Sequence, residues 1–275
     1  MLKGQTTRPG IDFIIVTFYR FGYAQILTES IKKYVKNIPY TINIINNGIN
    51  EGENTGFDIL KDMFKDEPNV NIIAGMEQDI DSNVLNPNTY KCKHDGRQVS
   101  IGSHAKVVAM SKGLLNSNRE YVCYLDADTI FLNEWVEDVI PLLEDNLFVS
   151  HKWREDIQMD GNNFCIVKRE TLDNNYLYEK GDLYPNLHYK DSNGMLAYWA
   201  LTKDNPFVIL TNSYENVALK SQHILDLKHG EQSWIHDKPI FYHQGRGSTR
   251  ADDIYTNWIK VTSAYLGMDF EDIRL

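Results

Sequence analysis

The sequence has few cysteines and no long apolar segment. Only three cysteines occur among 275 residues, Cys92, Cys123 and Cys165, so no disulfide framework is predicted. The first ten residues, MLKGQTTRPG, lack the apolar centre of a secretion signal. No later stretch approaches the ~18 continuous apolar residues that a membrane span needs. We therefore expect a protein of the reducing cytoplasm.

Positive charge is also scarce. The 28 Lys and Arg residues are outnumbered by 38 Asp and Glu residues, which leaves a net charge of −10. A surface of this sign repels nucleic acid duplexes and anionic bilayers, so neither is an expected partner. A small anionic ligand would need local help from a metal ion or from a few basic side chains.

Apolar residues are plentiful, and two periodicities alternate along the first half of the chain. The apolar run at 11–18 is typical of a strand buried on both faces, whereas Tyr23, Leu27 and Ile31 recur at helical spacing. The same pattern then predicts strands at 40–45, 70–74 and 121–125, and helices at 57–64 and 101–115. Alternating strands and helices favour an α/β fold with a mostly parallel sheet, whose ligands bind beyond the carboxyl ends of the strands.

The strongest functional motif lies at 121–131, YVCYLDADTIF. An apolar strand ends there in Asp126 and Asp128, and carboxylates one residue apart can both face a divalent cation where the chain turns. The same spacing recurs in Asp79 and Asp81, but in a polar stretch where solvated side chains are expected. For Asp126 and Asp128 the alternative is that they cap the turn or pair with Lys or Arg. Burial of two carboxylates without a partner would be costly.

Four segments resemble motifs of glycosyltransferase family 2, which has the GT-A fold. They are IIVTFYR at 14–20, INIINNG at 42–48, GSHAKVVAMSKGL at 102–114 and YLDADT at 124–129. The resemblance covers about residues 11–132, and the motifs share both order and spacing with the family. It departs at Asn46 and Asn47, where the family often has an acidic residue beside the nucleoside, so the base is left open.

The resemblance implies a single GT-A domain over 1–275, with a nucleotide-sugar-binding half at 11–132 and an acceptor-binding half at 133–275. Its activity would be metal-dependent transfer of a sugar from a UDP- or GDP-sugar donor to a carbohydrate or other hydroxyl acceptor, with inversion. The expected donor-binding residues of the first half are Thr17, Tyr19, Arg20, Asn46, Asn47, Ser103, Lys106 and Asp126. Ser103 and Lys106 begin a helix, where backbone N–H groups favour anions, although Lys106 is equally a solvated helix lysine.

A second motif, PIFYHQGRGSTR at 239–250, places a histidine at the end of a short apolar strand. The resemblance implies that His243 joins Asp126 and Asp128 as the third metal ligand, and a histidine ligand favours Mn²⁺ over Mg²⁺. Arg246 and Arg250 would then contact the diphosphate. The alternative is a buried structural histidine before a surface loop.

The expected catalytic base is Asp191, because it precedes an apolar helix much as the family's catalytic acid does. A helix-capping aspartate is the competing interpretation. Other acids of this half are Glu155, Asp156 and Asp160. Two rival functions remain open: a haloacid-dehalogenase-like phosphatase, whose motif usually has Thr or Val where Ile130 stands, and a non-catalytic module that binds carbohydrate or nucleotide-sugar.

Overall fold

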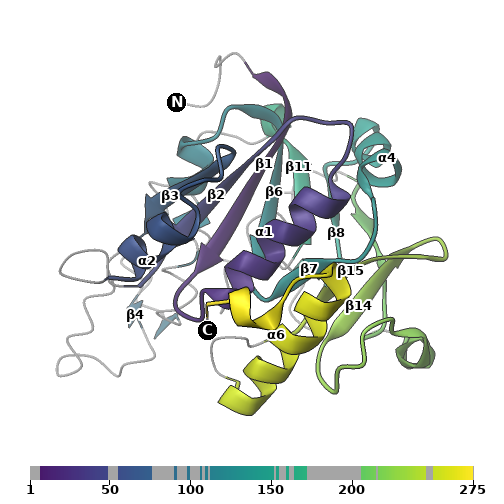
Figure 1. The fold of residues 1–275 in the computed structure, drawn as a ribbon. Helices are drawn as coiled ribbons and strands as arrows, with labels where there is room; N and C mark the ends of the chain where they lie inside the picture. The colour runs from purple at the N-terminus through teal and green to yellow at the C-terminus, as the bar shows by residue number, and fades with distance from the viewer. Residues whose placement is uncertain are drawn as a thin grey trace.

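The computed structural model describes residues 7–48, 55–75, 106, 109–110, 112–151, 164–171, 206–214, 216–245 and 250–274, and the backbone of four two-residue strands. Its largest unit is a seven-stranded sheet with the order β12-β8-β11-β6-β1-β2-β3 (Figure 1). The strands are β1 (Arg8–Thr17), β2 (Tyr40–Asn46), β3 (Val70–Ala74), β6 (Arg119–Asp126), β8 (Phe148–Ser150), β11 (Phe164–Lys168) and β12 (Val208–Ile209).

Strands β6, β1, β2 and β3 are mutually parallel, and β11 runs antiparallel to its neighbours β6 and β8. The four parallel strands are those that the apolar runs predict, within two residues at each end except at the start of β1. The expected α/β fold with a mostly parallel central sheet is therefore confirmed. The predicted helix at 101–115 is helical at its described residues, 106, 109–110 and 112–115.

Helices cover both faces of this sheet. Successive residues of β1 point to opposite faces, and apolar residues lie on both of them. Phe13 packs in the same core cluster as Leu27 of helix α1 (Gly22–Tyr34). Ile14 packs on the other face with Leu114, from the helical stretch that follows Lys106. Both faces of β1 are thus buried, which explains its continuous apolar sequence.

A second, smaller sheet lies beside the first and is entirely antiparallel, with the order β13-β14-β15-β7. Its strands are β7 (Thr129–Phe131), β13 (Thr211–Asn212), β14 (Glu231–Ile235) and β15 (Lys238–His243). The chain passes from the large sheet to the small one between β6 and β7, through Ala127 and Asp128, and again between β12 and β13, through Leu210. Helix α6 (Asp252–Leu266), yellow in Figure 1, packs against α1.

The remaining elements are short, apart from the eight-residue helix α2. Thr55 caps α2 (Gly56–Met63) by accepting a hydrogen bond from the Asp58 N–H at 3.2 Å. The others are β4 (Tyr90–Lys91), β5 (Gln98–Val99), β9 (Trp153–Arg154), β10 (Met159–Asp160), α4 (Val136–Val139), η1 (Ile140–Glu144), η2 (Arg169–Thr171), η4 (Val217–Gln222) and η6 (Phe270–Asp272).

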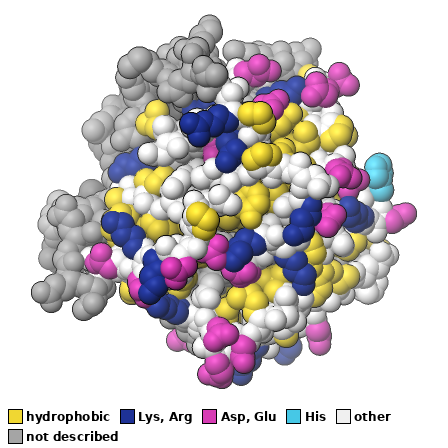
Figure 2. Space-filling view, turned by 45° about the horizontal axis from the view of Figure 1, so that its top comes forward, with side chains coloured by type: hydrophobic (Ala, Val, Ile, Leu, Met, Phe, Trp, Pro, Cys, Tyr) yellow, Lys and Arg dark blue, Asp and Glu magenta, His cyan; other side chains and the backbone are white. Residues whose placement is uncertain are grey.

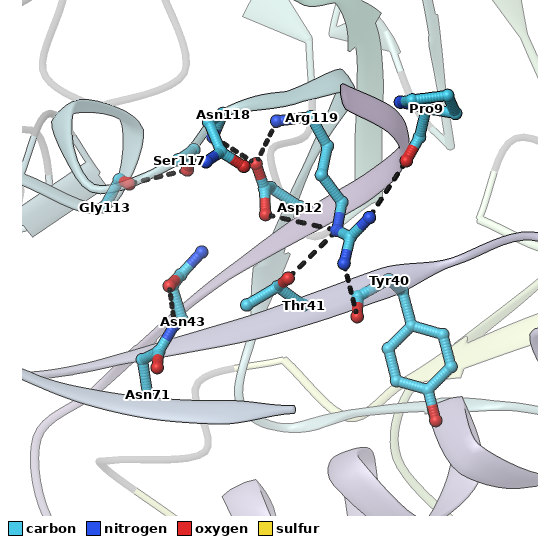
Figure 3. Close-up of polar contacts among 10 residues, drawn as sticks. All are labelled: Pro9, Asp12, Tyr40, Thr41, Asn43, Asn71, Gly113, Ser117, Asn118 and Arg119. Carbon is cyan, nitrogen blue, oxygen red and sulfur yellow. Dashed lines mark hydrogen bonds and ion pairs between the residues drawn. The ribbon is translucent and has the colours of Figure 1, made fainter. Parts of the chain in front are cut away.

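Polar contacts fix the amino-terminal edge of the parallel strands (Figure 3). The Asp12 carboxylate accepts hydrogen bonds from the backbone N–H groups of Asn118 and Arg119, each at 2.7 Å. The Arg119 guanidinium donates to Thr41 Oγ1 at 2.9 Å and to the Pro9 carbonyl at 2.9 Å. These bonds tie β1, β2 and the start of β6 together at the edge opposite their carboxyl ends.

The surface shown in Figure 2 mixes the two signs of charge: lysine and arginine side chains lie beside aspartate and glutamate side chains. Among the described residues, no helix has the length and apolar character needed to cross a bilayer.

Candidate functional site

The strand register brings the predicted residues of three strands to one edge of the large sheet. Thr17 pairs with Asn46 across β1 and β2, and Val16 pairs with Asp126 across β1 and β6. Because these strands are parallel, their carboxyl ends lie together, which is where ligands bind in such sheets. Thr17, Asn46 and Asp126 are therefore neighbours in space although Thr17 and Asp126 lie more than a hundred residues apart in sequence.

The second sheet brings His243 to the same place. Strand β15 runs antiparallel to β7, and His243 pairs with Thr129, the residue after Asp128. His243 Nε2 lies 3.5 Å from Asp128 Oδ1 and 4.0 Å from Asp126 Oδ2. One ligand atom of each of these residues lies within 4.8 Å of the others. The three predicted metal ligands thus form one cluster.

The donor set of this cluster fits a divalent cation. Two carboxylates supply hard oxygen ligands, and one imidazole nitrogen favours a transition ion such as Mn²⁺ over Mg²⁺. Asp128 is only 7% exposed, so its negative charge is costly to bury without a cation beside it. Burial lowers the pKa of His243, but the carboxylates of Asp128 and Asp126 outweigh it, and the net shift of this pKa is upward.

Lys106 is also part of this cluster. Its ammonium lies 2.6 Å from Asp126 Oδ1, and both side chains are largely buried. The sequence predicted Lys106 as an anion-binding residue at a helix start, and it left pairing of Asp126 with a Lys or Arg open as the alternative to a metal role; the structure shows such a pair. Lys106 is therefore paired with Asp126 in this structure rather than solvated, and its positive charge offsets that of the carboxylate.

Hydrogen bonds hold the segment around His243 against the first sheet. The Gln244 backbone N–H donates to the Asp128 carbonyl at 3.0 Å. The Tyr23 hydroxyl, from α1, donates to Gln244 Oε1. Burial and the nearby Asp128 charge raise the pKa of Tyr23, so this hydroxyl stays protonated and able to donate. The position of His243 is thus fixed from both the helix and the D-x-D turn.

Arg20 and Arg250, both predicted as donor-binding residues, contact each other. Arg20 Nη2 donates to the Arg250 carbonyl at 2.6 Å and to Asp252 Oδ1 at 2.9 Å. Arg20 also has a positive φ of 65°, a left-handed conformation that turns the chain sharply after β1. Tyr19, 44% exposed, and Arg20 line a hollow of about 800 Å³ with Tyr255.

Thr17, Asn46 and Asn47 reach the predicted edge but are almost fully buried, at 3%, 0% and 4% exposure. The Asn47 N–H donates to the Thr17 carbonyl at 2.7 Å, and Asn46 Oδ1 accepts from the Gly48 N–H at 3.3 Å. A Cβ at Gly75 would lie 2.4 Å from the Asn46 carbonyl oxygen, so the chain after β3 approaches this turn very closely. These residues shape the floor of the site.

Several predicted residues lie outside the described part of the chain. These are Ser103, Asp191, Arg246, Glu155 and Asp156, together with Asp79 and Asp81 of the second D-x-D pattern; of Asp160 only the backbone is described. Two residues that the sequence did not predict, His151 and Glu231, lie beside His243. His151 follows the short strand β8, FVS, which is a local signal similar to that of His243, whereas Glu231 begins the mostly polar strand β14, EQSWI, and carries no such signal.

Comparison with known proteins supports one class of activity. Residues 101–196 match the family described as Glycosyl transferase family 2. This segment includes the D-x-D strand and about a third of the 275 residues. Over this segment the chain is similar to glycosyltransferase family 2. Sugar transfer is accordingly the class of reaction that this match supports, and no curated protein matches the sequence.

The chain is also similar to several solved structures at low sequence identity. The glycosyltransferase GlyE of Streptococcus pneumoniae has a TM-score of 0.50 and 15% identity, over 98% of this chain and 62% of GlyE. TarS 1–349 of S. aureus has a TM-score of 0.48 and 12% identity, over 93% and 65% of the two chains. The mannosyltransferase PcManGT of Pyrobaculum calidifontis, solved with GDP-Man and Mn²⁺, has a TM-score of 0.45 and 13% identity, over 74% and 55%. This chain thus spans little more than half of PcManGT.

Proposed function

We propose that this protein is a metal-dependent glycosyltransferase, which transfers a sugar from a nucleoside-diphosphate sugar to an acceptor hydroxyl with inversion. The observation that carries the proposal is the cluster of Asp126, Asp128 and His243, whose ligand atoms lie within 4.8 Å of one another. It lies at the carboxyl edge of the sheet, where this class of fold binds nucleotides.

Asp126, Asp128 and His243 would hold Mn²⁺ or Mg²⁺. The bound ion supplies the positive charge that neutralises a departing diphosphate. Lys106 lies beside Asp126, so its ammonium is placed to share this charge with the diphosphate once the metal occupies the carboxylate. Ser103 would add a hydroxyl at the start of the same helix.

The donor nucleoside would lie against the turn after β1. Tyr19 offers an exposed aromatic ring, and Arg20 offers a cation that its bonds to Arg250 and Asp252 hold in place. Thr17, Asn46 and Asn47 form the buried turn beneath it and supply backbone polar groups. Arg246 and Arg250 would approach the diphosphate from the segment after His243.

The acceptor would bind to the second half of the chain, residues 133–275, and the half at 11–132 would hold the donor. We assign Asp191 as the base that removes the acceptor proton, because deprotonation raises the nucleophilicity of a hydroxyl as it attacks the anomeric carbon. In this arrangement the Asp191 carboxylate would act on the acceptor and the metal on the leaving diphosphate, on opposite faces of the sugar.

The test is the thermal stability of the protein with UDP- and GDP-sugars, with and without Mn²⁺. A donor at 100 times its dissociation constant should stabilise the fold by about 2.7 kcal/mol, and only when Mn²⁺ is present. Asp128→Ala should abolish this stabilisation because one remaining carboxylate and a histidine hold the ion poorly.

Asp81→Ala is the matched control, since it alters a D-x-D pattern of the same spacing elsewhere in the chain. It should leave the Mn²⁺-dependent stabilisation intact. Equal behaviour of the two variants would contradict the assignment of the metal to Asp126 and Asp128. Donor binding without any transfer or slow donor hydrolysis would instead favour the non-catalytic binding module.

A further inference from the structure

A second group of metal-binding side chains adjoins the D-x-D cluster. His151, Glu231 and His243 each offer a ligand atom, and these atoms lie within 4.8 Å of one another. His151 Nε2 lies 3.9 Å from Glu231 Oε2, which is too long for a hydrogen bond. His243 belongs to both groups, so the two candidate sites share one ligand.

Regular structure fixes the ligands of this second group. Glu231 and His243 are directly opposed across the β14–β15 pair, so their side chains lie on the same face of the small sheet. His151 follows the last residue of β8, and its ring lies 5.2 Å from that of Phe241 and 5.9 Å from that of His243. The Asn212 side-chain N–H donates to the His151 carbonyl at 3.3 Å, which ties the two sheets together here.

Two imidazoles and one carboxylate are a donor set for a late first-row ion. Ligands of tetrahedral Zn²⁺ lie ~2.0–2.2 Å from the ion, hence roughly 3.4 Å from one another. The 3.9 Å between His151 Nε2 and Glu231 Oε2 is close to that spacing, so small side-chain rotations would bring both atoms into contact with one ion. His151 is fully buried, whereas the Glu231 side chain is 18% exposed, which leaves an approach from solvent.

We propose that His151, Glu231 and His243 form a second divalent-metal site, selective for Zn²⁺, that excludes the ion of the D-x-D cluster by withdrawing His243 from it. A neutral imidazole has one nitrogen lone pair and one N–H, so His243 binds one ion at a time. The ligands then divide by chemistry: the oxygen-rich group suits Mn²⁺ or Mg²⁺, and the nitrogen-rich group suits Zn²⁺.

The existence of the second site is independent of the proposed function, but the exclusion rests on it. If the D-x-D cluster also binds an ion, occupancy of the second site by Zn²⁺ removes one of its three protein ligands. Zn²⁺ would then act as an inhibitor whose effect Mn²⁺ overcomes by mass action.

The experiment measures binding of each metal alone to the full chain. Zn²⁺ affinity is obtained by competition with a chromogenic chelator, and bound Mn²⁺ by the loss of its free-ion EPR signal. Glu231→Gln keeps the side-chain shape and removes the anionic ligand, so it should weaken Zn²⁺ at least about tenfold more than it weakens Mn²⁺. Asp128→Asn should weaken Mn²⁺ more than it weakens Zn²⁺. The matched control for charge is Glu120→Gln, at an exposed residue of β6, which should change neither affinity.

His151→Gln is a second variant for the same site, with circular dichroism to confirm that it folds. In the wild type, added Zn²⁺ should release bound Mn²⁺ with one Mn²⁺ lost for each Zn²⁺ bound. Zn²⁺ affinity that is lost in Asp128→Asn but kept in Glu231→Gln and His151→Gln would overturn the second site. Simultaneous binding of both ions would overturn the exclusion. Zn²⁺ binding that needs Glu231, in a protein that binds no Mn²⁺, would support the second site while contradicting the proposed function.

Discussion

The Lys106 ammonium lies 2.6 Å from Asp126 Oδ1, so a lysine from one helix already neutralises a carboxylate of the candidate metal cluster. A cation that binds Asp126 must compete with this ammonium or share the carboxylate with it. Lys106 thus links the affinity for metal to the affinity for an anionic ligand.

Replacement of Lys106 should separate these two affinities. In Lys106→Met, Mn²⁺ alone should bind about fivefold more tightly, the equivalent of about 1 kcal/mol for a lost competing ion pair. Affinity for a nucleoside diphosphate should fall, because its charge loses a cationic partner. Mn²⁺ titration by EPR and calorimetry with the nucleotide measure the two effects. The control is Lys65→Met, which removes an exposed ion pair with Asp62 and should change neither the Mn²⁺ affinity nor the nucleotide affinity. Weaker Mn²⁺ binding by Lys106→Met would contradict competition between Lys106 and the ion for Asp126.

Gly113 should be intolerant of alanine although it is helical. An added Cβ would lie 2.6 Å from Ile14 Cγ2 and 3.0 Å from Ile45 Cδ1, so the helix would have to move away from the sheet. This crowding costs about 1–3 kcal/mol, against a gain of about 1 kcal/mol in helix propensity. We expect urea denaturation of Gly113→Ala to show a net loss of stability. Leu115→Ala, at a side chain 51% exposed, is the control and should change stability much less.

His223 should contribute to acid destabilisation. Burial, and to a lesser degree the charge of Lys220, lowers its pKa below the ordinary value of 6.5. The unfolded chain therefore binds a proton at a higher pH than the native one, and the free energy of unfolding falls as pH drops from 6.5 toward the native pKa. The change of the free energy of unfolding with pH, measured by denaturation with EDTA present, should be smaller in His223→Gln. His229→Gln, at an exposed histidine, should retain it; an unchanged slope in His223→Gln would exclude this contribution.

Asp191→Asn distinguishes a base from a helix cap. A base acts on the acceptor proton in the transition state, so transfer should fall by about 10²-fold or more while donor affinity stays nearly constant. Asn and Asp cap helices about equally well, so a capping role predicts that both activity and stability survive. Near-normal transfer would direct attention to Glu155, Asp156 and Asp160. The measurements are initial rates and donor titration on the same preparation.

The parallel half of the fold was predictable because its inner strands β1, β2 and β6 are buried over most of their length and therefore read as continuous apolar runs. Phe13, Ile14 and Ile15 illustrate this, since neither face of β1 meets water. The D-x-D turn was predictable for the same reason: Asp126 ends such a run. The small sheet was harder to predict from the sequence, because strands β13 and β7 have only two and three residues and carry little periodicity.

The contacts within the site could not be read from the sequence. The pairing of Lys106 with Asp126 depends on how one helix packs across the sheet, and the proximity of His151 to His243 depends on two sheets meeting. Each residue could be recognised as polar at the end of an apolar segment, but its partner is set by long-range packing. The resemblance to a known family supplied the association of His243 with the D-x-D motif, which spacing alone does not.

The two-residue connection between β6 and β7 has a mechanical consequence. Asp126 ends β6 of the large sheet, His243 ends β15 of the small one, and Asp128 lies in the connection between the two sheets, so an ion bound by all three would bridge the sheets. An ion held by all three residues would restrict the motion of one sheet relative to the other. Slower hydrogen exchange at the amides of β14, which this ion does not touch, would then report its presence. Loss of the ion would increase the motion of the donor-binding half relative to the acceptor-binding half.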